Sequence, residues 1–117
     1  MKKKQCIILL PTYYNDGKGV PLEVLTRMRR EIDEMFDGHT IAGTVEGTYR
    51  MADGTIATDK SLEVWIAVES DKIEVLRKLT SRFARILKQE TIYFEVMNSE
   101  VEFIEPEHEN GTDSDYR

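Results

Sequence analysis

The chain has little cysteine and no long apolar run, and each of these absences excludes a class of protein. Its single cysteine, Cys6, falls inside a predicted strand and cannot form an internal disulfide, so we expect a reducing compartment, the cytoplasm. No stretch approaches the roughly 20 apolar residues of a membrane span. The basic start, Met1–Lys4, resembles the end of a signal peptide, but the apolar run behind it stops at Pro11 and is too short. We therefore predict a cytoplasmic protein that does not contact the membrane.

The chain also lacks the excess of basic residues that binding to nucleic-acid phosphates requires. It has 22 acidic and 16 basic residues, a net charge of −6. Residues 105–117 hold five acids and one arginine, or −4, which leaves −2 for residues 1–104. We therefore expect no nucleic-acid binding. At 117 residues the chain is long enough for one domain. We place that domain at 1–104 and predict that 105–117 is an acidic, disordered tail.

The spacing of apolar residues predicts the element order strand, helix, strand, strand, helix, strand. Period-two or continuous apolar segments predict strands, and three- to four-residue spacing predicts helices. The predicted strands span 6–10, 40–50, 62–69 and 91–97, with a short fifth at 101–104, and the predicted helices span 21–36 and 71–88. The pattern predicts an α+β fold: a ferredoxin-like βαββαβ two-layer sandwich, with an antiparallel four-stranded sheet and two helices on one face.

Local signals predict where the helices begin and end. Gly38 is suited to the position after the first helix. Asp71 and Glu74 have the spacing of a capping box at the start of the second helix. His39 is predicted to be a surface histidine beside a helix end.

With both helices on one face, the other face of the sheet is open and carries Trp65. An open sheet face with aromatic residues is typical of an interface. We therefore expect self-association through this face, with a protein partner or a small polar ligand as the alternative occupant.

Acidic residues gather around the predicted connection at 51–60. Asp53 and Asp59 lie in it, and Glu46 lies on the strand before it. Carboxylates are the ligands that Mg²⁺ prefers, and Mn²⁺ is similar in this respect. Folds of this order that hold metal through strand-end acids need one near the first strand, where the nearest candidate is Asp16. A metal site of Asp16, Glu46, Asp53 and Asp59 is therefore an alternative to a solvated turn, and our first expectation is no cofactor.

Two resemblances to known protein groups add to the predictions of fold and site. The residues Gly38-His39-Thr40, Gly43, Gly47-Thr48-Tyr49, Asp53-Gly54, Asp59, Arg82-Phe83 and Gln89-Glu90-Thr91 resemble a pattern found in small uncharacterised bacterial proteins. The order of elements is similar to that of the PII/CutA-like regulators. That similarity implies a trimer that binds a nucleotide or small effector between subunits, beside the connection at 51–60.

The leading hypothesis is a non-enzymatic, ligand- or protein-binding regulatory protein that acts as a homo-oligomer. Its predicted binding residues are Tyr49, Arg50, Asp53, Asp59, Lys60 and Trp65. The alternative is a small metal-dependent hydrolase or nuclease that uses the four acids named above. A third hypothesis is an interaction or inhibitory factor whose acidic tail imitates a charged partner.

Overall fold

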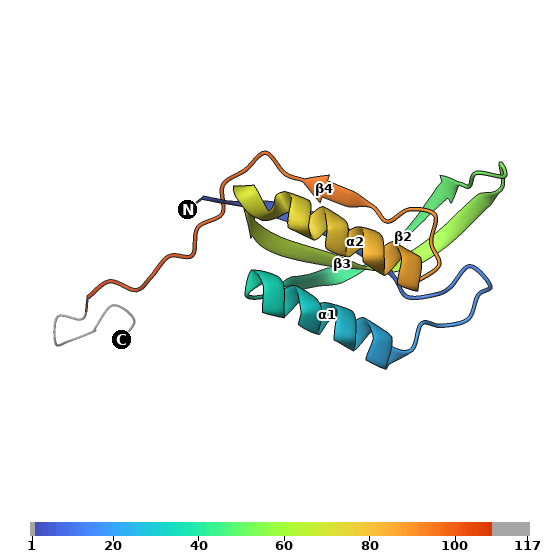
Figure 1. Cartoon of the computed structure of the whole chain (residues 1–117), viewed down its shortest axis with the longest axis horizontal. Coiled ribbons are helices and arrows are strands. Elements are labelled where there is room, and N and C mark those ends of the chain that lie inside the picture. The colour runs from blue at the N-terminus through green and yellow to red at the C-terminus, as the bar shows by residue number, and fades with distance from the viewer. Residues whose placement is uncertain (1, 109–117) are drawn as a thin grey trace, which may run out of the picture.

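The structure, a computed structural model, describes residues 2–108 and confirms the predicted two-layer α+β architecture (Figure 1). Four antiparallel strands form one sheet, and two helices cover one of its faces. The elements are β1 (Lys3–Pro11), α1 (Leu22–Phe36), β2 (Thr40–Arg50), β3 (Ile56–Glu69), a 3₁₀ turn (Ser70–Lys72), α2 (Ile73–Ile86) and β4 (Phe94–Val96). The strand order β2-β3-β1-β4 is that of the ferredoxin-like fold.

Strand β1 lies inside the sheet, which explains its continuous apolar sequence. It pairs with β3 from Lys3 opposite Glu69 to Pro11 opposite Ser61. On its other side it pairs with β4 through three residue pairs. The edge strand β2 pairs with β3 along its whole length, with one register irregularity between Ile41 and Gly43.

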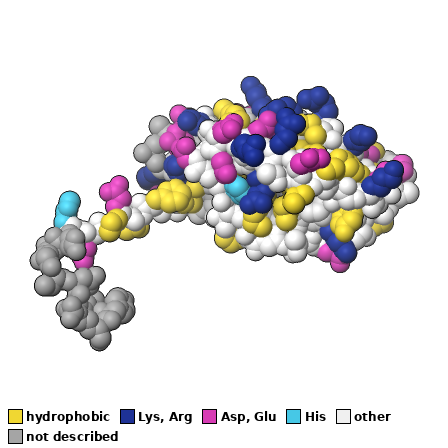
Figure 2. All heavy atoms as spheres, turned by 90° about the horizontal axis from the view of Figure 1, so that it is seen from below, with side chains coloured by type: hydrophobic (Ala, Val, Ile, Leu, Met, Phe, Trp, Pro, Cys, Tyr) yellow, Lys and Arg dark blue, Asp and Glu magenta, His cyan; other side chains and the backbone are white. Residues whose placement is uncertain are grey.

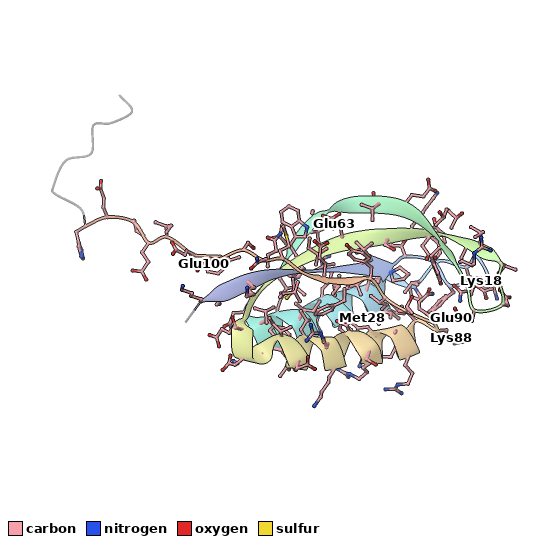
Figure 3. All side chains as sticks on the ribbon, turned by 90° about the horizontal axis from the view of Figure 1, so that it is seen from above. Lys18, Met28, Glu63, Lys88, Glu90 and Glu100 are labelled. Carbon is pink, nitrogen blue, oxygen red and sulfur yellow. The ribbon has the colours of Figure 1, made fainter. Side chains whose placement is uncertain are left out.

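The core lies between the sheet and the helices. Every second residue of the central strands is buried, and both helices contribute an apolar stripe. Met28 of α1, for example, points from its helix toward the sheet (Figure 3). The buried apolar residues are Cys6, Ile8, Leu10, Val20, Leu25, Met28, Ile32, Phe36, Val64, Ile66, Val68, Leu76, Leu79, Phe83 and Leu87. Within residues 2–108, no helix is long and apolar enough to cross a membrane.

The ends of both helices differ from the prediction. Helix α1 ends on Asp37, which adopts the left-handed conformation with φ 65° and donates its backbone N–H to the Asp33 carbonyl. The predicted terminator Gly38 follows it with φ 141°. The predicted capping box is wrong: Asp71 lies in the 3₁₀ turn, and among residues 2–108 no side chain caps the start of α2. Glu74 instead forms an ion pair with a residue of its own helix, Arg77.

Two strand boundaries also differ. Strand β3 begins at Ile56, so the connection between β2 and β3 is a short turn over 51–55 rather than the predicted loop over 51–60. Strand β4 covers only 94–96 of the predicted 91–97. The predicted fifth strand is reduced to one bridge, Lys3 to Val101. Residues 105–108 are exposed and have no regular structure, and the rest of the predicted tail, 109–117, lies outside the described residues.

His39 is a buried link between α1 and β2, not a surface histidine. Its side chain is 8% exposed, and its Nδ1 lies 2.5 Å from Oδ1 of Asp33. The Nε–H of Arg29 donates to its Nε2 across 3.0 Å. Because a guanidinium can only donate, Nε2 is the acceptor, and the proton of the neutral ring is on Nδ1, shared with Asp33.

Candidate functional site

The open face of the sheet carries a hollow of about 560 Å³, which we call the sheet groove. It lies on the side that the helices leave uncovered, and Glu63 projects from that side in Figure 3. All four strands and the segment before β4 line it. The carboxylates of the lining are Glu46, Asp59, Glu63 and Glu95, the aromatic side chains are Tyr49 and Tyr93, and apolar contact comes from Ile7, Leu9 and Val45.

Strand register brings these residues together. Leu9 of β1 lies opposite Glu63 of β3, and Ile7 lies opposite Glu95 of β4. Residues directly opposite each other in antiparallel strands point to the same face. Because Ile8 and Val64 point to the core, their neighbours along each strand must point to the open face. Of these neighbours, Ile7, Leu9 and Glu63 line the groove.

Tyr49 has a buried hydroxyl for which residues 2–108 offer no hydrogen-bond partner. A buried polar atom without a partner is costly, so such atoms are rare in folded proteins. Burial raises the pKa of Tyr49, and the nearby carboxylates of Asp59 and Glu90 raise it further. The hydroxyl therefore keeps its proton at neutral pH and is a free hydrogen-bond donor at the edge of the groove.

Asp59 is the second unusual group. Burial raises the pKa of this carboxyl. Asp59 also lines a second hollow of about 490 Å³, between the turn at 51–55 and the loop after β1, whose lining includes Tyr13 and Lys60. It thus stands where the two hollows meet. Glu90 fixes the turn nearby, because its Oε2 accepts the backbone N–H of Ala52 at 3.1 Å.

Two further carboxylates in the groove are each oriented by an aromatic residue two positions away in the sequence. Nε1 of Trp65 donates to Oε2 of Glu63 at 2.6 Å. The hydroxyl of Tyr93 donates to Oε1 of Glu95 at 2.7 Å, and this bond, with the charge of Glu95, raises the pKa of Tyr93. The groove is consequently negative, with aromatic rings along it.

The structure separates the predicted binding residues into four places. Tyr49 and Asp59 lie in the sheet groove, and Lys60 lines the second hollow with Asp59. Trp65 lies outside the groove lining and is 37% exposed on the same open face. Arg50 and Asp53 stabilise the turn instead.

The contacts of Arg50 and Asp53 are local. Arg50 donates to the Gly54 carbonyl at 2.9 Å. Oδ1 of Asp53 accepts the N–H of Thr55 at 2.9 Å and its hydroxyl at 2.6 Å, and these bonds lower the pKa of Asp53. Both side chains are therefore occupied in holding the turn.

The alternative metal site does not form among the described residues. Within 2–108, no group of three or more His, Cys, Asp or Glu side chains is placed to hold a metal ion. Asp16 accepts the backbone N–H of Lys18 in its own loop, and Asp53 holds the turn. Glu46 and Asp59 remain near each other only as part of the groove lining.

Sequence reasoning missed Tyr93, Glu95 and Glu90 as site residues. A period of two puts Glu63 on the same face as Trp65, and the same period along 93–95 puts Tyr93 and Glu95 on one face. Glu90 carries no local signal, because its role depends on the distant turn that it contacts.

The comparisons with known proteins give one structural match. No protein-family profile matches the chain, and no curated protein matches it. A solved structure of a phage SAM lyase in complex with S-methyl-5′-thioadenosine has the same fold, with a TM-score of 0.66. The match covers 81% of this chain and 80% of that chain at 14% sequence identity.

This match corrects the leading functional hypothesis. The protein that shares the fold over four-fifths of the chain is an enzyme, which conflicts with the interpretation as a non-enzymatic regulatory protein. Of the two resemblances drawn from the sequence, the shared βαββαβ architecture is confirmed. The finer implications of these resemblances, membership of an uncharacterised family and a PII/CutA-like effector site, are not confirmed.

Proposed function

We propose that this chain is a lyase that cleaves S-adenosylmethionine in the sheet groove and releases S-methyl-5′-thioadenosine. The observation that carries the proposal is the buried, unpartnered hydroxyl of Tyr49 beside Asp59 and Glu90, at the edge of a groove rich in carboxylates. The likeness of the fold to that of a phage SAM lyase supports the choice of substrate.

The chemistry of the groove suits this substrate. S-adenosylmethionine has a flat adenine, a ribose with two hydroxyls and a positively charged sulfonium. Tyrosine rings can pack against adenine, and carboxylates accept hydrogen bonds from ribose hydroxyls. The carboxylates of Asp59, Glu63 and Glu95 attract the sulfonium and the ammonium group of the substrate.

The proposed reaction breaks the bond between the sulfonium sulfur and the γ-carbon of the amino-acid chain. The electron pair of that bond stays on sulfur, which becomes the neutral thioether of S-methyl-5′-thioadenosine. The γ-carbon can receive a new bond from the substrate's own carboxylate, which gives a lactone. In the alternative route a base removes the proton on the neighbouring carbon, and an alkene is left. Both routes balance without water or a further reactant.

The groove residues have distinct roles in this proposal. The Tyr49 hydroxyl donates its free hydrogen bond to the ribose or to the substrate carboxylate. Asp59, half-buried at the junction of the two hollows, faces the sulfonium side and would be the base in the alkene route. Glu63 is held in place by Trp65 and stabilises the cationic substrate.

The test is product analysis by mass spectrometry on purified protein with S-adenosylmethionine. We expect S-methyl-5′-thioadenosine to form well above the rate in buffer, and Asp59→Asn to lower this rate. Glu23→Gln, an exposed acid at the start of α1, is the matched control and should change nothing. The NMR spectrum of the co-product distinguishes lactone from alkene. Product formation no faster than in buffer, together with no binding of S-methyl-5′-thioadenosine, would contradict the proposal.

Self-association through the open sheet face stays a proposal and is compatible with this function. A second copy over the face would cover the groove and exclude water from the substrate, which strengthens electrostatic interactions there. The mass of the native particle tests it, with Trp65→Ala as the variant expected to weaken assembly. The cytoplasmic location likewise stays a prediction.

A further inference from the structure

The residues after β4 form an extended arm, which we define as residues 101–108. The N–H of Val101 donates to the Lys3 carbonyl at 2.8 Å. The Lys3 ammonium lies 5.2 Å from the centre of the Phe103 ring, and Lys2 bonds Glu100 at 2.9 Å. These contacts direct the arm past the start of β1 and away from the domain (Figure 1).

The arm carries exposed apolar side chains between acidic ones. Phe103 is 73% exposed and Ile104 is 82% exposed. Aromatic and β-branched residues in extended backbone are typical of a strand that pairs and packs. The acids on either side are Glu102, Glu105 and Glu107. Such a segment is suited to an apolar groove with basic residues beside it.

The domain has a groove of mixed character between its helices and its sheet edge. This hollow of about 590 Å³, the α2–β4 groove, runs between α2 and β4. Its apolar lining is Ala84, Ile92, Phe94 and Val96, and its polar lining is Arg77, Thr80, Ser81, Glu90 and Thr91. Strand β4 pairs with β1 on one side, and among residues 2–108 its other edge pairs with no strand. Free strand edges are templates for a further strand.

Charge favours the acidic arm as the occupant of this groove. Helix α2 carries four basic residues, Arg77, Lys78, Arg82 and Arg85, against one acid, Glu74. Figure 2, a view from below, shows Lys and Arg side chains interspersed with Asp and Glu side chains over the domain. Arg77 and Glu90 both line the groove. Arg77 is ion-paired with Glu74, and its guanidinium lies 5.5 Å from the centre of the Phe94 ring.

In each chain, the arm runs away from the α2–β4 groove of the same chain. Val96 pairs with Cys6, and Val101 pairs with Lys3, so after β4 the chain continues along β1 toward the N-terminus. The α2–β4 groove lies beside residues 90–96, which come before the point where the chain leaves β4. To occupy it, the arm would have to reverse direction and lose its contacts with Lys3.

We infer that the arm of one copy docks in the α2–β4 groove of a second copy. It adds a strand to the free edge of β4, places Phe103 and Ile104 against the apolar lining, and sets its acids against the cations of α2. Each copy gives one arm and receives one. The interface is separate from the open sheet face and does not depend on the proposed reaction.

Disulfide trapping tests this arrangement directly, because the chain's one natural cysteine, Cys6, is buried. The variant Ile104→Cys/Ser81→Cys places one thiol on the arm and one on an exposed position of the groove lining. Under mild oxidation we expect a covalent dimer or larger covalent ring as the main species on a non-reducing gel. The control pair Ile104→Cys/Leu22→Cys uses an equally exposed position on α1 and should stay uncrosslinked.

The alternative outcomes are distinct. A disulfide within one chain would show that the arm folds back on its own domain and would overturn the inference. No disulfide above the control would overturn it as well. A second measurement covers poor folding of the cysteine variants: Ile104→Asp and Ser81→Glu should each lower the mass of the native particle. Wild-type protein that is a single chain at micromolar concentration would also overturn the proposal.

Discussion

The indole Nε1 of Trp65 donates a 2.6 Å hydrogen bond to Oε2 of Glu63, two residues earlier on the same face of β3. Glu63 lines the sheet groove, so the chain's only tryptophan is bonded to the wall of the proposed binding site. Indole emission depends on hydrogen bonding and on nearby charge, and a ligand that contacts Glu63 will alter both.

We therefore predict that S-methyl-5′-thioadenosine changes the tryptophan fluorescence in a saturable manner. A titration measures this, and Asp59→Asn should shift the midpoint to higher concentration. Methionine, which lacks the adenosine, is the control and should leave the signal flat. If calorimetry detects binding of S-methyl-5′-thioadenosine but the tryptophan fluorescence does not change, the ligand binds outside the sheet groove.

Tyr49→Phe should separate activity from stability. The hydroxyl is buried and has no hydrogen-bond partner within 2–108, so its removal should raise the free energy of unfolding by about 1–3 kcal/mol. We expect formation of S-methyl-5′-thioadenosine to fall roughly 10- to 100-fold, or about 1.4–2.7 kcal/mol of transition-state stabilisation. Tyr13→Phe, an exposed tyrosine outside the sheet groove, is the control. A loss of stability equal to the loss of activity would mean that Tyr49 has a structural role.

Asp59→Asn and Asp53→Asn should change stability in opposite directions. Burial raises the pKa of Asp59, so its ionised form disfavours folding, and the neutral amide introduced by Asp59→Asn should raise the melting temperature at pH 7. This gain should disappear as the pH falls below the ordinary aspartate pKa of about 3.9.

The pKa of Asp53 is lowered by its bonds to Thr55, so its ionised form favours folding. Asp53→Asn should lower the melting temperature at pH 7. The difference in melting temperature between Asp53→Asn and wild type should shrink at low pH, because acid then protonates Asp53 in the wild-type protein. Melting curves at pH 7, 5 and 3 provide the measurement, and shifts of the same sign in both variants would contradict it.

His39→Gln should destabilise the fold. The substitution disturbs two hydrogen bonds, one to the exposed Asp33 and one from Arg29 in a part-buried position, that join α1 to the start of β2. Loss of such bonds costs about 1–3 kcal/mol. Urea unfolding measures the free energy, and His108→Gln, at the chain's other and exposed histidine, should have no effect. Equal stability of the two variants would show that the His39 contacts contribute nothing.

Much of the fold could be predicted because its signals are local. The apolar run in β1 and the three- to four-residue spacing in α1 report directly on which faces are buried. The first six of the 14 residues of β3 were not predicted as strand, because residues 56–61 are mainly polar and small and form a strand only where β2 pairs with them.

The site was less predictable because it has no linear motif. Tyr49 and Asp59 were predicted from the composition of one segment, and both lie in the groove. Glu95 reaches the same hollow only through the pairing of β4 with β1, and no spacing along the chain encodes that pairing. The unpartnered state of the Tyr49 hydroxyl is a property of packing and has no sequence signal.

The two faces of the sheet are under different constraints, although the same strands supply both. Side chains that point to the helices, such as Ile8 and Val64, are fully buried, and their replacement would create cavities. Side chains on the open face, such as Glu63 and Glu95, line the groove and can change with little loss of folding energy. Substrate preference could therefore diverge among descendants of this chain while the fold persisted, since substitutions that reshape the groove leave the core intact.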